Sequence, residues 1–165
     1  TPEEIAISVV AEIYKVMNKC SGLSLRERRD DFVIVRGSGD LATGVIVRLV
    51  KSGFRVLALD ISQPSAIRRT VAFAQAFFED NKTCTVEGVT AKVTTNVPEA
   101  MTLMENRMVP LMADPAGRMI RALEPLVVVD AIIAKRNIGT QIDMAPLVIG
   151  LGPGFTPGTD CHCAV

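Results

Sequence analysis

The sequence predicts an α/β fold, a doubly wound parallel sheet with helices on both faces in three layers. Segments typical of strands alternate with segments typical of helices along most of the chain, which is the pattern of such folds. The strand segments are almost entirely apolar, as expected for strands that helices cover on both sides. Apolar residues make up 48% of the 165 residues and aromatic residues only 4%, so aliphatic side chains must build the core.

The first expected element is a helix over residues 1–18, within an N-terminal unit of residues 1–20 that packs on the main domain. Thr1 can cap this helix, Pro2 suits its first turn, and Glu4 completes a capping box. Apolar residues then recur at helical spacing, at Ile5, Val9, Ile13 and Val16. A polar stretch over 21–31 predicts a connector, and residues 32–165 form the main domain.

The main domain is expected to begin with a strand over 32–36, followed by a helix that Gly53 stops at about residue 51. A second strand over 54–59 precedes a helix over 65–79. Residues 83–86 and 89–94, around Glu87 and Gly88, predict a hairpin or two short edge strands. The remaining elements are a helix over 98–108, a strand over 109–113, a helix over 116–123 and strands over 126–129 and 146–151.

A glycine-rich turn follows the first predicted strand and opens a helix. Residues 37–42 read GSGDLA and fit the pattern G-x-G-x-x-G/A of Rossmann-like domains. Gly37 would allow a tight turn, and Gly39 would allow a phosphate to approach the backbone closely. The predicted cofactor-binding turn consists of Gly37, Ser38, Gly39, Asp40 and Leu41.

Two aspartates bear on how this turn would be used. Asp60 directly follows the second predicted strand, about 20 residues further on, where an acidic side chain can bind a ribose diol. Asp40, in contrast, leaves a second interpretation open. Its carboxylate could cap the free N–H groups of the helix and place negative charge where phosphate would bind. The turn would then be purely structural.

Further polar residues follow the later strands, at the edge where open α/β sheets bind their ligands. Asp114 and Asp130 each directly follow a predicted strand, and we include both in the candidate cofactor site. Each could instead cap the helix or turn that follows it. Glycine-rich residues after the last predicted strand, including Gly152 and Gly154, complete this edge.

A short basic segment lies within two helical turns of Asp130. Lys135 and Asn137 could face the crevice at the sheet edge and bind an anion there. A cluster of solvated charges is the alternative interpretation of this segment.

Cys161, His162 and Cys163 stand side by side near the end of the sequence. Zinc sites usually separate their ligands by two or more residues and need a second pair, so we expect no metal here, with these three as weak candidates. On a strand, the two cysteines would share one face and His162 would point to the other. Incidental structural residues, a soft ligand or sulfur carrier, and a nucleophilic thiol are the alternatives.

Charge and hydropathy argue against several classes of partner. The 18 basic and 18 acidic residues give a net charge of zero without a basic tract, which argues against nucleic acid and against a polybasic membrane contact. The apolar runs are too short to span a membrane. With no leader-like segment and only four scattered cysteines, we expect a cytoplasmic protein with reduced thiols.

Four segments resemble the accessory proteins of selenium-dependent molybdenum hydroxylase systems, and the likeness extends over about residues 32–165. The segments are 34–44 (IVRGSGDLATG), 63–71 (QPSAIRRTV), 130–137 (DAIIAKRN) and 144–156 (MAPLVIGLGPGFT). Residues 1–13 (TPEEIAISVVAEI) separately resemble the helix that closes the Rossmann domain of xanthine dehydrogenase accessory proteins.

The resemblance implies a maturation factor for a molybdenum hydroxylase. Such a factor would bind a nucleotide-type or molybdopterin cofactor at the strand carboxyl ends and aid the insertion of sulfur or selenium. Catalytic residues stay unknown, because only motif positions carry over: Gly37, Gly39, Asp40, Asp130, Lys135, Asn137, Gly152 and Gly154. The family's chains continue beyond the segment that matches residues 160–162, so we also expect the domain to be truncated at its C-terminus.

Two other functions fit the same fold. An NAD(P)-binding oxidoreductase would need an acid or base near the nicotinamide, and the sequence offers one His and one Tyr. A non-catalytic interaction module is the other alternative. Fold alone does not choose among these functions.

Overall fold

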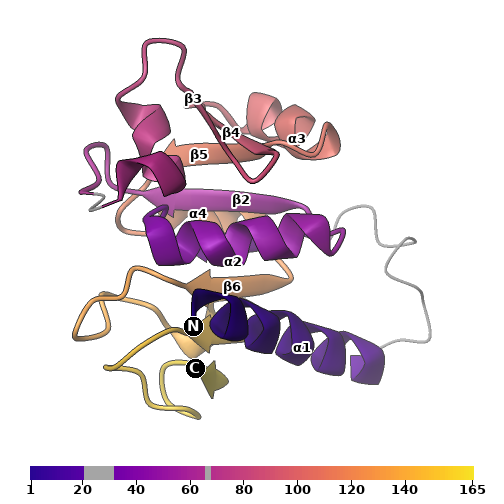
Figure 1. Cartoon of the computed structure of the whole chain (residues 1–165). Helices are drawn as coiled ribbons and strands as arrows, with labels where there is room; N and C mark the ends of the chain where they lie inside the picture. Colours follow the sequence, from indigo (N-terminus) through magenta and orange to yellow (C-terminus); the bar gives the residue numbers. More distant parts are fainter. Residues whose placement is uncertain (21–31, 66–67) are drawn as a thin grey trace.

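The computed structural model describes residues 1–20, 32–65 and 68–165 and is built on one eight-stranded sheet (Figure 1). The connector expected over 21–31 lies outside the described residues. The strand order is β3-β4-β5-β2-β1-β6-β7-β8, and each neighbouring pair except β3–β4 is parallel. The strands are β1 (Val33–Arg36), β2 (Val56–Asp60), β3 (Thr83–Val86), β4 (Val89–Val93), β5 (Val109–Ala113), β6 (Val127–Asp130), β7 (Leu147–Gly150) and β8 (Cys163–Ala164).

The order of the parallel strands is that of a Rossmann-like fold. With the β3–β4 hairpin set aside, the strands run third, second, first, fourth, fifth and sixth across the sheet. The direction in which the sheet grows therefore reverses between β1 and β6, and this reversal is the switch point where such sheets bind ligands. The register sets Arg36 at the end of β1 beside Asp130 at the end of β6. The predicted doubly wound α/β fold is confirmed.

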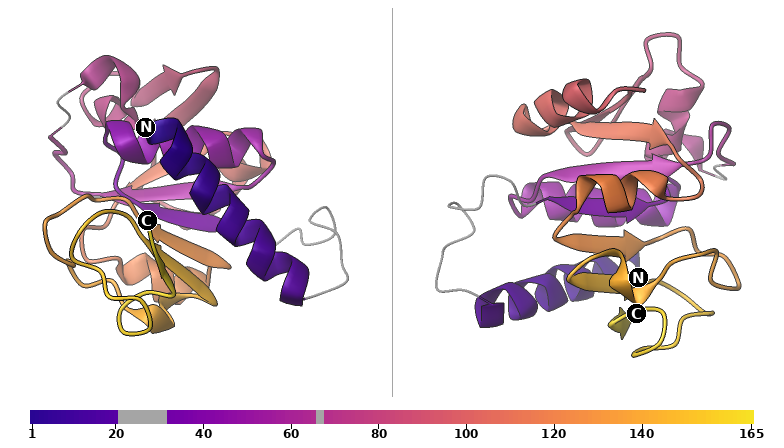
Figure 2. Two further views of the ribbon diagram at one scale, coloured as in Figure 1. Left: turned by 60° about the horizontal axis from the view of Figure 1, so that its bottom comes forward. Right: turned by 180° about the vertical axis from the view of Figure 1, so that it is seen from behind.

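Helices cover both faces of the sheet, as Figures 1 and 2 show. The helices α1 and α2 pack against each other on one face, and α3 and α4 lie on the other. The helices are α1 (Pro2–Cys20), α2 (Asp40–Lys51), α3 (Val97–Glu105) and α4 (Arg118–Leu123), with 3-10 turns η1 (Arg69–Val71), η2 (Phe73–Phe77) and η3 (Ile142–Met144). At the start of α1, the Glu4 N–H donates to Thr1 Oγ1 at 3.3 Å, as the predicted cap requires.

The core consists of two clusters separated by the sheet. Val33 and Val35 of β1 belong to one cluster with Ile13 of α1, whereas Ile34 belongs to the other with Ile120 of α4. Successive residues of a strand point to opposite faces, so a strand between two helical layers must be apolar at every position. This is the physical reason for the uninterrupted apolar strands seen in the sequence.

The single helix expected over 65–79 is wrong. The described part of this segment forms the two short 3-10 turns η1 and η2 instead. Two of its N–H groups bond to the turn after β1 and to α2: Ala74 donates to the Ser38 carbonyl at 2.9 Å, and Phe73 donates to Thr43 Oγ1 at 2.9 Å. These tertiary bonds replace the i to i−4 bonds of an α-helix. The β3–β4 hairpin is confirmed, and β8 is a strand that the sequence analysis did not assign.

No helix within residues 1–20, 32–65 and 68–165 combines the length and apolar character that a membrane crossing requires.

The packing of α1 can be tested with Ile13→Ala. This residue is fully buried between α1 and the sheet, so the truncation should lower the free energy of unfolding by about 2–5 kcal/mol. Ile7→Ala on the same helix is the control, because Ile7 is 58% exposed and should change stability by about 0.5 kcal/mol or less. Urea denaturation followed by circular dichroism measures both, and equal effects would contradict the packing of α1 on the domain.

Candidate functional site

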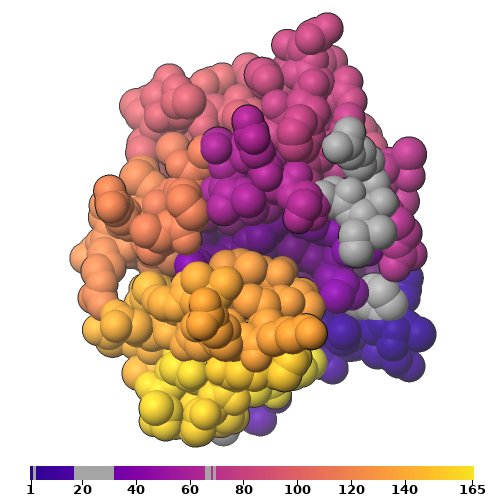
Figure 3. Space-filling model, turned by 90° about the vertical axis from the view of Figure 1, so that its left-hand side faces the viewer, coloured from indigo at the N-terminus to yellow at the C-terminus, as the bar shows by residue number. Residues whose placement is uncertain are grey.

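The predicted site residues gather at the carboxyl ends of the parallel strands. The register brings the turns that follow β1, β5, β6 and β7 to one edge of the sheet. Figure 3 faces this edge: purple atoms, which belong to the region around β1 and β2, lie between the coral part of the chain and the orange loop after β6. This edge contains the switch point between β1 and β6.

The two glycines of the β1 turn have different reasons to be glycine. Gly37 has a φ of +107°, and a Cβ atom there would lie 2.9 Å from the Ala131 carbonyl oxygen, so the fold itself requires glycine. Gly39 caps the N-terminus of α2 with a φ of −66°, and a Cβ atom there would meet nothing within 4 Å. The fold therefore leaves Gly39 beside open space.

Asp60 holds the β1 turn in place. Its Oδ2 accepts hydrogen bonds from the Ser38 N–H at 2.7 Å and from Ser38 Oγ at 2.5 Å. Its Oδ1 accepts from the Ile61 N–H at 2.7 Å. An ionised carboxylate has about four acceptor positions, so roughly one is left for a ligand hydroxyl. Ribose binding by Asp60 stays a prediction, and the Ser38 N–H, already bonded to Asp60, is not free for an anion.

Asp40 uses its carboxylate within the turn, as the second interpretation of the sequence had it. Oδ1 accepts from the Leu41 N–H at 2.9 Å, and Oδ2 lies 3.1 Å from Nε of Arg68, which is 71% exposed. A surface pair of this kind contributes at most about 1 kcal/mol and can open easily. The N–H groups of Gly39 and Asp40 themselves have no hydrogen-bond partner among the described residues.

The buried side chains of Arg36 and Asp130 connect the turns around the switch point. Arg36 is 1% exposed and Asp130 2%, and Arg36 Nη1 lies 3.4 Å from Asp130 Oδ2. Thr140 Oγ1 donates to the same Oδ2 at 2.5 Å and accepts from Arg36 Nη1. Nη2 of Arg36 donates to the carbonyls of Pro115 at 3.2 Å and Ile138 at 3.1 Å.

Sequence reasoning placed Asp130 and Arg36 at this edge, but it missed Thr140 and the hydrogen bonds from Arg36 to the loops. The signal available in the sequence was Arg36, a charged residue at the end of an otherwise apolar strand. The structure places it in register with Asp130. No pattern in the sequence indicated Thr140, because a loop brings it back to Asp130.

Asp114 and Asp130 both accept hydrogen bonds from the chain that follows them. Asp114 Oδ2 accepts from the Met119 N–H at 2.7 Å, at the start of α4. Asp130 Oδ1 accepts from the Ile132 N–H at 3.0 Å. These are the capping contacts that the sequence analysis kept as an alternative. Cofactor binding by either residue stays a prediction.

The β6–β7 loop, residues 131–146, carries the predicted residues Lys135 and Asn137. Asn137 faces into the structure: its Nδ2 donates to the Thr140 carbonyl at 2.8 Å and to Asp160 Oδ2 at 3.1 Å. The Thr156 N–H donates to Asp160 at 2.7 Å and, as the main cause, lowers the pKa of that carboxyl. Lys135 is exposed and has no ion pair within the described residues.

Gly152 and Gly154 lie in the loop after β7, which packs against the β6–β7 loop. Both have positive φ, and a Cβ atom on Gly154 would lie 2.6 Å from Cα of Arg136. A Cβ atom on Gly152 would contact the Ile133 side chain at 3.8 Å. Gly154 thus serves the close packing of the two loops, whereas Gly152 is favoured by its positive φ alone, and a ligand contact at either position stays a prediction.

The expectation that Cys161 and Cys163 share one face of a strand is wrong. Cys161 is fully buried in the cluster on the α3 and α4 face, whereas Cys163 packs against the cluster on the α1 and α2 face. Cys161 precedes β8 and forms an isolated bridge with Pro157, so regular strand alternation does not apply to it. His162 is exposed, and its Nδ1 accepts from the Val148 N–H at 3.0 Å.

Neither thiol has the environment of a reactive thiolate. Burial raises the pKa of Cys161, and the negative charge of Asp160 raises it further. Burial also raises the pKa of Cys163, with a contribution from Glu12. Within the described parts of the chain, no group of three His, Cys, Asp or Glu side chains could hold a metal ion.

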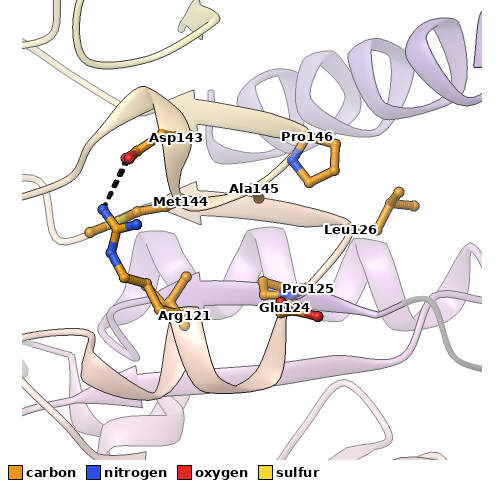
Figure 4. A pocket seen from close by; sticks show the side chains of 9 residues that line it. Arg121, Glu124, Pro125, Leu126, Asp143, Met144, Ala145 and Pro146 are labelled. Atoms are coloured by element: carbon orange, nitrogen blue, oxygen red, sulfur yellow. Dashed lines mark hydrogen bonds and ion pairs between the residues drawn. The ribbon is translucent and has the colours of Figure 1, made fainter.

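A cavity of about 560 Å³ lies elsewhere, between α4 and the segment that leads into β7 (Figure 4). Leu126 and Pro146, which immediately precede β6 and β7, line it together with Met144. Arg121 donates to Asp143 at 3.1 Å at its rim. The cavity is near the amino ends of these strands, and none of the predicted site residues lines it.

The thiol environments predict slow alkylation of the folded protein. Iodoacetamide at pH 8 should label Cys161 and Cys163 at least about tenfold more slowly in the folded protein than in urea, because only the thiolate reacts. Fragment-ion mass spectrometry separates the two positions, and equal rates in both states would contradict the burial. The unfolded chain loses these protons at lower pH than the folded protein, so their contribution to stability falls as pH rises through the ordinary thiol range.

Comparison with known proteins gives one informative match. No family model matches the sequence, and no solved structure matches it. The chain is 51% identical over 169 residues to a protein of Escherichia coli (strain K12) named Uncharacterized protein YqeB. The alignment covers 100% of the chain and 31% of that protein, so the chain spans about a third of the length of this relative.

Proposed function

We propose that the chain binds a nucleotide-bearing or molybdopterin-type cofactor at the switch point and acts as an accessory factor in the maturation of a molybdenum hydroxylase. The Rossmann strand order and the glycine turn support the site of binding. The resemblance to accessory proteins of molybdenum hydroxylase systems supports the choice of cofactor and of partner.

The open space at Gly39 is the observation that carries the proposal. Nothing in the fold requires glycine there, and the N–H groups of Gly39 and Asp40 lack partners among the described residues. These groups begin a helix of 12 residues, whose dipole favours negative charge at this end. A phosphate group of the cofactor would fill the space and accept from both N–H groups.

Apolar side chains near the turn suit the ring system of such a cofactor. Ile61 follows β2 and is 46% exposed, and Ile132 follows β6 and is 38% exposed. The Ile132 backbone N is 3.3 Å from the position of a Cβ atom on Gly37, so this residue adjoins the turn. The exposed Arg68 could move from Asp40 to the phosphate, because its present ion pair is weak.

The other functions have less support from the described residues. The one tyrosine, Tyr14, lies on α1 and donates to the Ser52 carbonyl at 3.2 Å, and His162 accepts from β7. Neither contact identifies an acid or base for a bound nicotinamide, which an oxidoreductase would need. The burial of Cys161 also gives a sulfur-carrying or selenium-carrying role no support.

Titration of the purified chain tests the proposal. The ligands are the cytosine and guanine dinucleotide forms of molybdopterin, the mononucleotides AMP, CMP and GMP, and NADPH. We expect micromolar or tighter binding of a molybdopterin form by calorimetry. Flat titrations with every molybdopterin form and nucleotide would refute the proposed cofactor site, and binding of NADPH alone would favour the oxidoreductase.

Gly39→Ala should weaken cofactor binding by at least about tenfold without unfolding the protein. The added methyl group fills the space that the phosphate would occupy, whereas stability should change by about 1 kcal/mol or less. Gly37→Ala provides the contrast, because it should destabilise the fold through its φ and its contact with Ala131. Unchanged affinity in a folded Gly39→Ala protein would show that no phosphate lies against this turn.

A further inference from the structure

The buried guanidinium of Arg36 has a role that the cofactor site alone does not explain. Its hydrogen bonds reach the turn after β5, through Pro115, and the β6–β7 loop, through Ile138 and Thr140. Arg36 itself ends β1, just before the glycine turn. One side chain thus joins the three turns that surround the switch point.

Stability alone is a weak reason for such a group. Taking two charges out of water offsets most of their attraction, and apolar residues of similar size often replace a buried ion pair without loss. The strand that Arg36 ends is otherwise apolar, and so is the β6 segment that Asp130 ends. The geometry of the contacts therefore needs another explanation.

The contacts fix residues 131–139 at both ends. The bond from Thr140 to Asp130 closes the base of this segment, and the Ile138 carbonyl is bonded to Arg36. Close packing supports it on both sides, since neither Gly37 nor Gly154 leaves room for a Cβ atom against it. The segment lies as a wall beside the β1 turn, and its outer side chains are exposed.

We propose that Arg36 is a positioning residue, which holds residues 131–139 as one wall of the cofactor site. The identity of the ligand rests on the proposed function, whereas the role of Arg36 in holding residues 131–139 does not. Loss of the Arg36 contacts lets the segment move away from the β1 turn. Affinity for the cofactor then falls even though no ligand contact has been removed.

Trypsin can report the position of this wall without any ligand. Lys135 and Arg136 are exposed, yet in a rigid segment both bonds should be cleaved slowly, because cleavage follows the fraction of open molecules. Arg36→Met removes all the donors, and Thr140→Val removes only the hydroxyl that joins Arg36 to Asp130. In both variants, cleavage after Lys135 and Arg136 should accelerate at least about tenfold relative to cleavage after Lys82 in the β3 region.

The rate of cleavage after Lys135 and Arg136, divided by the rate after Lys82, separates opening of the wall from unfolding. Unfolding would accelerate all three cleavages together and leave this ratio unchanged. Thr140→Val keeps the ion pair and covers the case in which Arg36→Met fails to fold. Arg121→Met is the matched control, because Arg121 is 58% exposed and pairs with Asp143 at the surface. Its cleavage ratio should equal that of the unmodified protein. An unchanged ratio in a folded Arg36→Met or Thr140→Val protein would overturn the proposal.

Cofactor binding provides the second readout, with the molybdopterin dinucleotide used for Gly39→Ala. Bound cofactor should slow cleavage after Lys135 and Arg136 in the unmodified protein, and Thr140→Val should bind it about tenfold more weakly. Full affinity in a variant whose wall is open would overturn the positioning role and leave the proposed cofactor site intact. Flat titrations with the unmodified protein would refute the cofactor site, while the cleavage ratio would still decide whether Arg36 holds the wall.

Discussion

The arrangement of the switch point depends on one buried contact, between the guanidinium of Arg36 and the carboxylate of Asp130. Parallel pairing of β1 with β6 brings these residues into register, so the contact is a direct product of the strand order. Each charge needs the other, because either one alone would be buried without compensation. Thr140, Pro115 and Ile138 are the other hydrogen-bond partners of the Arg36 guanidinium. Because these residues lie in the loops after β5 and β6, the contacts fix the position of both loops against the end of β1.

The β1 turn, which follows Arg36, is likewise held by a polar side chain at the end of a strand. Asp60 bonds to Ser38 and thereby fixes the turn from the neighbouring strand β2. Most polar groups around the turn are satisfied within the protein. The exception is the pair of N–H groups at Gly39 and Asp40, which have no partner among the described residues. Because its other polar groups are bonded within the protein, the turn is preorganised for a ligand that accepts hydrogen bonds from these two N–H groups.

The sequence was sufficient to predict the fold, because apolar strands and glycine turns are local patterns. The helix expected over 65–79 failed because Thr43 and Ser38, far away in sequence, bind its N–H groups. At the site, Asp60 and Asp130 were placed at the correct edge, but their partners were not predictable. Ser38 and Thr140 reach them through turns whose shape depends on the folded structure, and Cys161 lies outside the regular strand that its spacing suggested.

The position of α1 has a consequence for how the chain acquires its structure. This helix precedes the rest of the described chain, yet it packs against α2 and also against β7, more than 120 residues later. Its apolar stripe, which includes Val9 and Ile13, has its complete binding surface only after β7 has formed. Contacts between distant parts of a chain slow folding, and apolar surface exposed in the meantime promotes aggregation. During synthesis, α1 can therefore pack on α2 early, but its contact with β7 forms only after most of the described chain has been made.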